Sequence, residues 1–85
     1  MRIWAKIMNN QKIIKDTVFK EAGDFDAAKF QSYLEEIAYG LHIGTPIILN
    51  KHINHFLEFN ITNFNPTDFA EPIEFDQLVI ENVSE

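Results

Sequence analysis

The chain has 85 residues, a formal net charge of −6 and 46% hydrophobic residues, which predicts one domain, residues 1–85, with a small core. It contains no cysteine, so disulfides and Cys-ligated zinc or iron–sulfur sites are excluded, and a reducing compartment fits. No charged leader precedes an apolar run, and no apolar stretch is long enough to cross a bilayer. We therefore expect a cytoplasmic protein that does not enter the membrane.

The charge is distributed unevenly along the chain. Residues 1–20 hold five basic residues against one acidic residue, whereas residues 21–85 hold two basic residues against twelve acidic ones. Either a basic hairpin is neutralised by an acidic strand beside it, or it offers a basic face to an acidic partner. The overall acidity disfavours a general nucleic-acid binder, because phosphate contacts need Lys and Arg.

The first twenty residues predict a β-hairpin. Residues 3–8 and 13–19 alternate between apolar and polar side chains, and the polar residues 9–12 between them are typical of a turn. A four-residue loop would set Ile7 opposite Ile14 and Ile3 opposite Val18, so we prefer it to a two-residue Asn9-Asn10 turn, which mixes polar with apolar pairs. In this register Asp16, opposite Ala5, is the single misfit on the apolar face.

The same register assigns a mixed apolar and basic set to the second face of the hairpin. Aromatic residues, Met and Arg are enriched in interfaces, so this face is a candidate partner-binding surface. An alternative that the sequence leaves equally open is that the segment 60–72 folds over it as a second minor core. The face comprises Arg2, Trp4, Lys6, Met8, Ile13, Lys15, Thr17 and Phe19, of which Trp4, Lys6, Met8, Ile13, Lys15 and Phe19 are the candidate binding residues.

An amphipathic helix is predicted over residues 26–41. Its apolar residues recur at three- and four-residue steps, and Asp24 or Asp26 is placed to cap its first turn. The end is ambiguous: Gly40 can adopt a left-handed cap, or the helix can continue through His42 towards Gly44. The stripe that should face the sheet consists of Ala27, Phe30, Leu34, Ile37, Ala38 and Leu41.

The second half of the chain gives weaker signals. Residues 46–49 fit a buried connector or an edge strand, and residues 51–59 a short helix capped by Asn50. Residues 60–72 read as an irregular connection with one helical turn at 65–68, opened by Asn65-Pro66. Residues 73–83 predict a last strand with a bulge at Asp76-Gln77 and with Leu78 and Ile80 facing the core.

These elements predict an α+β fold. The N-terminal hairpin and the C-terminal strand would form a three-stranded antiparallel sheet in the order 2-1-3, with both helices on one face. Four short segments, Ile3-Trp4-Ala5-Lys6-Ile7, Thr62-x-Phe64, Asp68-Phe69 and Phe75-Asp76-x-Leu78, together resemble a group of small uncharacterised proteins from clostridium-type Gram-positive bacteria. The resemblance implies a bacterial cytoplasmic setting and carries no activity with it.

No residue pattern predicts an enzyme, a cofactor or a metal. His52 and His55 are three residues apart on the short helix, near His42 and Glu58, but H-x-x-H without further ligands is more often a pair of surface imidazoles. The acidic residues Asp68, Glu71, Glu74 and Asp76 do not match a calcium loop. The chain also lacks a nucleophile elbow and a phosphate-binding loop.

The sequence therefore favours a small non-catalytic interaction protein, whose partner is another protein or a second copy of itself. The alternative is nucleic-acid binding, with Trp4 and Phe19 as stacking platforms and with Arg2, Lys6 and Lys15 on phosphates. A metal-dependent activity through the two histidines is the least favoured class.

Overall fold

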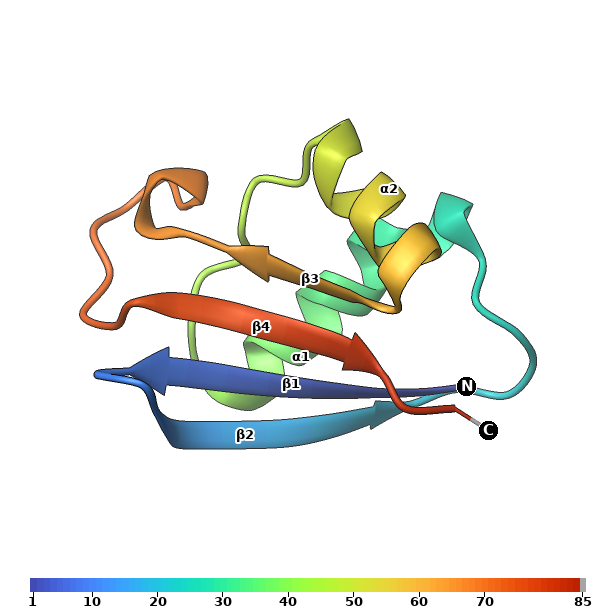
Figure 1. Ribbon diagram of the computed structural model, residues 1–85, viewed down its shortest axis with the longest axis horizontal. Helices are drawn as coiled ribbons and strands as arrows, with labels where there is room; N and C mark the ends of the chain where they lie inside the picture. The colour runs from blue at the N-terminus through green and yellow to red at the C-terminus, as the bar shows by residue number, and fades with distance from the viewer. Residues whose placement is uncertain (85) are drawn as a thin grey trace.

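A four-stranded antiparallel sheet organises the computed structural model, which describes residues 1–84. The strands are β1 (Arg2–Asn9), β2 (Lys12–Lys20), β3 (Ile61–Phe64) and β4 (Gln77–Asn82), in the order β2-β1-β4-β3. Figure 1 shows the sheet with α1 behind it and with α2 beside β3. The α+β class, the hairpin and the central place of β1 are confirmed.

The expected three-stranded sheet is wrong, because β3 adds a fourth strand at the edge. Residues 61–64 lie within the segment that the sequence suggested was irregular. Thr62 and Phe64 alternate inward and are 4% and 0% exposed, while Ile61 and Asn63 face outward. Phe64 pairs with Leu78 of β4, so this short strand extends the core side of the sheet.

The preferred hairpin register holds only next to the turn, where Met8 lies opposite Ile13, and it is wrong along the rest of the hairpin. Asn9 pairs with Lys12, so the turn consists of Asn10 and Gln11, both in the left-handed region at φ 51° and 64°. An irregularity between Ile7 and Met8 then shifts the pairing of β2. As a result Ile3 lies opposite Phe19 rather than Val18, and a one-residue shift exchanges the two faces of a strand.

Helix α1 (Phe30–Leu41) covers the inner face of the sheet as its apolar stripe predicted. Phe30, Leu34 and Ile37 are at most 1% exposed, and Tyr33 joins them although the predicted stripe omitted it. A 3-10 turn, η1 (Ala27–Lys29), precedes the helix and leaves Ala27 at the surface, so Ala27 is not part of the stripe.

Both ends of α1 have a local cause. Asp26 Oδ1 accepts a hydrogen bond from the Ala28 N–H at 3.0 Å, which confirms the predicted acidic cap. The helix ends at Leu41 because His42 takes the left-handed conformation, at φ 59°, so it neither ends at a Gly40 cap nor continues through His42, the two alternatives that the sequence left open.

The second helix, α2 (Asn50–Phe59), begins one residue before the expected start, so Leu49 and not Asn50 is the flanking residue. Asn60 ends it in the left-handed conformation, at φ 61°. A 3-10 turn, η2 (Pro66–Asp68), follows β3, in agreement with the helical turn predicted there. Within residues 1–84 there is no helix with the length and apolarity that crossing a bilayer requires.

Candidate functional site

The side of the sheet that faces away from α1 is the candidate site. We call it the outer face and define it by the residues of the four strands whose side chains alternate with the buried ones. Cross-strand pairs join them, among them Trp4 with Val18 and Glu81, and Lys6 with Asp16 and Val79. The outer face comprises Arg2, Trp4, Lys6, Met8, Ile13, Asp16, Val18, Lys20, Ile61, Asn63, Gln77, Val79 and Glu81.

Trp4 lies at the centre of the polar contacts on this face. Its indole Nε1 donates a hydrogen bond to Asp16 Oδ2 at 2.8 Å, and Lys6 Nζ lies 4.1 Å from the centroid of its ring. Lys6 Nζ also pairs with Glu81 Oε1 at 3.1 Å. These contacts connect β2, β1 and β4, and they leave Lys6 with its charge compensated and its side chain only 13% exposed.

No other described segment covers the outer face. Both helices lie on the other side of the sheet or beyond its β3 edge (Figure 1). The segment 60–72 does not fold over the face, because its first part forms β3 and its second part packs against α2 through Asp68. Val18 and Ile13 remain 45% and 47% exposed. The alternative of a second minor core is thus excluded for residues 1–84.

Two of the six candidate binding residues lie on the opposite side of the sheet, which corrects the expected surface. Phe19 is 9% exposed and packs against Tyr33, with ring centroids 5.3 Å apart. Lys15 Nζ donates to the carbonyl oxygen of Leu41 at 2.7 Å, at the negative end of the α1 dipole. The shifted register is the cause, and it leaves Trp4, Lys6, Met8 and Ile13 together.

The same correction separates the residues that were expected to bind nucleic acid in the alternative function. Phe19 is in the core and Lys15 is bound to α1, so neither shares a face with Trp4. Lys6, the basic residue nearest to Trp4, is paired with Glu81. Of this set, only Trp4, Arg2 and Lys6 remain together on the outer face, and Lys6 is the one that is paired with an acidic residue.

The residues that sequence reasoning missed are the apolar ones of the neighbouring strands. The predicted register puts Val18 in the core, the predicted faces do not include Val79, and Ile61 falls in the segment expected to be irregular. The alternation of Val79 with Leu78 and Ile80 was the available signal, because successive side chains of a strand point to opposite faces.

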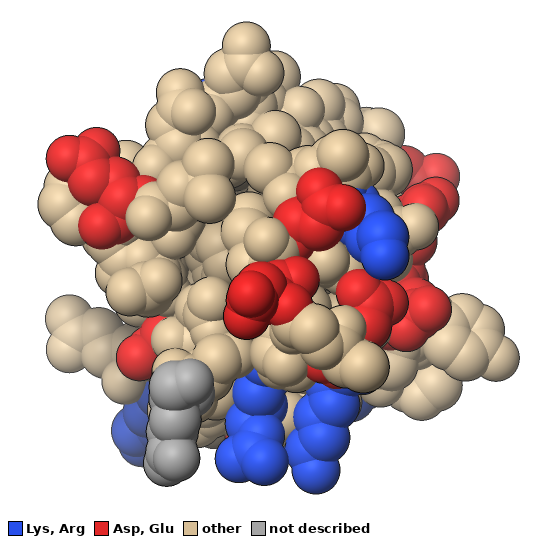
Figure 2. Space-filling view, turned by 90° about the vertical axis from the view of Figure 1, so that its right-hand side faces the viewer, with Lys and Arg blue, Asp and Glu red and all other residues tan. Residues whose placement is uncertain are grey.

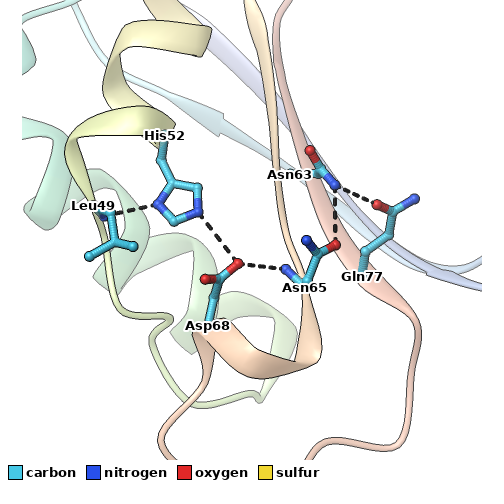
Figure 3. A network of polar contacts seen from close by, with 6 residues as sticks. All are labelled: Leu49, His52, Asn63, Asn65, Asp68 and Gln77. Carbon is cyan, nitrogen blue, oxygen red and sulfur yellow. Dashed lines mark hydrogen bonds and ion pairs between the residues drawn. The ribbon is translucent and has the colours of Figure 1, made fainter.

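A second polar cluster is buried between α2, β3 and η2 (Figure 3). His52 is 2% exposed, and its Nδ1 accepts a hydrogen bond from the Leu49 N–H at 2.9 Å. The ring proton therefore resides on Nε2, which lies 3.4 Å from Asp68 Oδ2. That oxygen also accepts the Asn65 N–H at 2.8 Å. These contacts hold the start of α2 against η2, the turn that follows β3.

Burial lowers the pKa of His52 below its ordinary value of 6.5, and the nearby Lys51 acts in the same direction, while the facing Asp68 carboxylate opposes both without cancelling them. The imidazole is therefore neutral at neutral pH. Because its Nδ1 is occupied by a backbone N–H, it cannot accept a proton from a substrate while that bond is present. The His52–Asp68 pair therefore has a structural role.

The histidines and carboxylates do not converge. His52 points inward and stacks on Phe64 with ring centroids 4.3 Å apart, whereas His55 is exposed on α2. Asp68 is buried beside His52, and Asp76 accepts the Asn10 N–H at 2.7 Å. Across residues 1–84, no group of three or more His, Asp or Glu side chains is arranged to hold a metal ion.

Comparisons with known proteins give no relative from which a function could be transferred: no family model, no curated protein and no solved structure matches the chain.

Proposed function

We propose that this protein is a small non-catalytic interaction module whose outer face docks a second copy of the chain. The observation that carries the proposal is an uncovered sheet face with Trp4 at its centre and exposed apolar side chains on the strands around it. Large exposed apolar patches on soluble domains usually mark binding sites for other molecules.

Charge favours a copy of the same chain as the occupant. In a two-fold symmetric contact each patch meets itself, so a patch with a large net charge would repel its copy. The outer face carries Arg2, Lys6 and Lys20 against Asp16 and Glu81, a difference of one charge, and Lys6, Asp16 and Glu81 already have partners within the face. The face is nearly balanced although the whole chain has a net charge of −6.

The size of the face predicts a weak dimer. Four strands about 4.8 Å apart and about 20–25 Å long give roughly 400–500 Å² of projected surface per copy. Stable complexes bury about 800 Å² per partner. We therefore expect association that depends on concentration rather than an obligate dimer.

Sedimentation velocity over a wide concentration range tests this proposal. We expect the parent to shift from monomer to dimer with increasing concentration, and the V18S/I61S double variant to remain monomeric. The control is Y39S/L57S, which removes two exposed apolar side chains on the helices, 83% and 55% exposed, and should associate like the parent. A parent that is monomeric at every concentration, or equal association of both variants, would refute docking of a second copy on the outer face.

A further inference from the structure

We propose that the free edge of β2 binds an extended acidic segment of another protein as an added antiparallel strand. This inference goes beyond the docking of a second copy, because it concerns the backbone edge of β2 rather than the side chains of the outer face, and a different partner. β2 spans nine residues, pairs with β1 on one side only, and forms the end of the sheet. Nothing lies beyond it in Figure 1.

An unpaired edge offers backbone groups to a partner strand. On the free side of β2, alternate residues turn their N–H and C=O groups outward, and these groups can pair with an extended chain. The other end of the sheet offers much less, because β3 has four residues and leads directly into Asn65-Pro66, where proline has no N–H to donate. The long edge is therefore the one suited to strand addition.

The positive charge along the free edge of β2 favours an acidic partner. β2 carries Lys12, Lys15 and Lys20 against Asp16, and Asp16 already accepts the indole N–H of Trp4. Neither Lys12 nor Lys20 has an acidic side chain within 4.0 Å among the described residues. Figure 2 shows Lys and Arg side chains along the lower rim, the level at which Figure 1 draws β1 and β2, and acidic side chains above them.

The edge is also partly apolar. Ile13, Ile14 and Val18 are 47%, 56% and 45% exposed, the largest such group on any one strand. Lysines on an edge oppose pairing with a strand of like charge, which includes β2 of a second copy. The matching ligand is an extended segment of about nine residues in which acidic side chains alternate with β-branched ones.

The test uses the acetylated and amidated peptide Glu-Val-Glu-Val-Glu-Val-Glu-Val-Glu and the full chain. Titration followed by ¹⁵N NMR should show saturable binding and slower amide exchange in β2. The K12E/K20E variant should bind about tenfold more weakly. The matched control, K29E/K51E, makes the same change in net charge on exposed lysines of η1 and α2 and should bind within about twofold of the parent, since its charges lie away from the edge.

A second peptide keeps the proposal testable if K12E/K20E does not fold. Replacing the two central valines by proline removes backbone donors without changing the charge, and it should abolish binding to the parent. The proposal is overturned if the proline peptide binds equally, if both lysine variants lose affinity equally, or if the amides that gain protection lie outside β2. Tighter binding of a poly-dT oligonucleotide, lost in K12E/K20E, would also overturn it in favour of nucleic acid.

Discussion

His52 shows how a single residue links the pH of the solution to the packing of this fold. In the folded chain the imidazole is buried and neutral, with Nδ1 accepting the Leu49 N–H and with a pKa below 6.5. In the unfolded chain it ionises at its ordinary pKa. Around and below pH 6.5 the imidazole therefore binds more protons in the unfolded state than in the folded state, and the contribution of His52 to the free energy of unfolding falls as the pH is lowered.

We predict that H52Q flattens this dependence between about pH 7 and pH 5. Glutamine retains an acceptor oxygen for the Leu49 N–H but does not ionise. Urea unfolding at several pH values measures the effect, and H55Q, on the exposed face of α2, should keep the slope of the parent. A parental slope in H52Q would mean that the buried histidine does not control this part of the pH dependence.

The residue scale is also where prediction of the candidate site failed. Trp4, Lys6, Met8 and Ile13 were assigned correctly to one face, but Phe19 and Lys15 were not. One assumed register placed all six candidate binding residues. Because the side chains of a strand alternate between the two faces of a sheet, a shift of one residue in β2 moved two of the six to the opposite face.

At the scale of elements, the irregularity between Ile7 and Met8 explains why that register was missed, because the turn itself leaves Met8 opposite Ile13, as the preferred loop implies. The turn residues Asn10 and Gln11 both have positive φ, as in a type I′ turn, for which Asn-Gly is the strongest sequence signal. Asn fits the first position, but Gln at the second position bears the steric cost of the left-handed region, about 1–2 kcal/mol. Without the glycine, residues 9–12 carry no strong signal for a two-residue turn at Asn10-Gln11.

This strain predicts that Q11G stabilises the protein by about 0.5–1 kcal/mol, the cost of the left-handed region less the extra entropy that glycine loses on folding. N10G is the matched comparison and should gain less, because asparagine tolerates positive φ. Equilibrium unfolding of the two variants and the parent measures the difference. An N10G variant that gains as much as Q11G would contradict the assignment of the strain to Gln11.

Helix α1 was predictable because its apolar residues repeat over several turns, whereas the last strand was predicted over residues 73–83 and only residues 77–82 form β4. Phe30, Leu34 and Ile37 recur at helical spacing, and Leu78 and Ile80 at strand spacing. β3 was not predictable on the same basis. Of its two inward residues, Thr62 and Phe64, only Phe64 is apolar, and its identity as a strand depends on its pairing with β4.

At the scale of the whole molecule, the two ends of the chain meet in the centre of the sheet. β1 and β4 are neighbours, with Ile3 opposite Asn82, although nearly the whole sequence separates them. The contact continues past the strands, since the Val83 N–H donates to the Arg2 carbonyl at 2.9 Å and the Arg2 N–H donates to Ser84 Oγ at 2.7 Å. The central pairing of the fold is therefore also its least local one.

That arrangement predicts that a circular permutant folds, with a short Gly-Ser linker joining residue 85 to Met1 and new ends between Glu71 and Pro72, both of which are exposed. The linker would turn the β4–β1 pair into a hairpin, so refolding should be faster, because the loop that closes this pair becomes short. Stopped-flow fluorescence of Trp4, which lies on β1 opposite Glu81, reports the pairing directly. A permutant that folds more slowly than the parent, or not at all, would mean that the β4–β1 pairing does not limit folding.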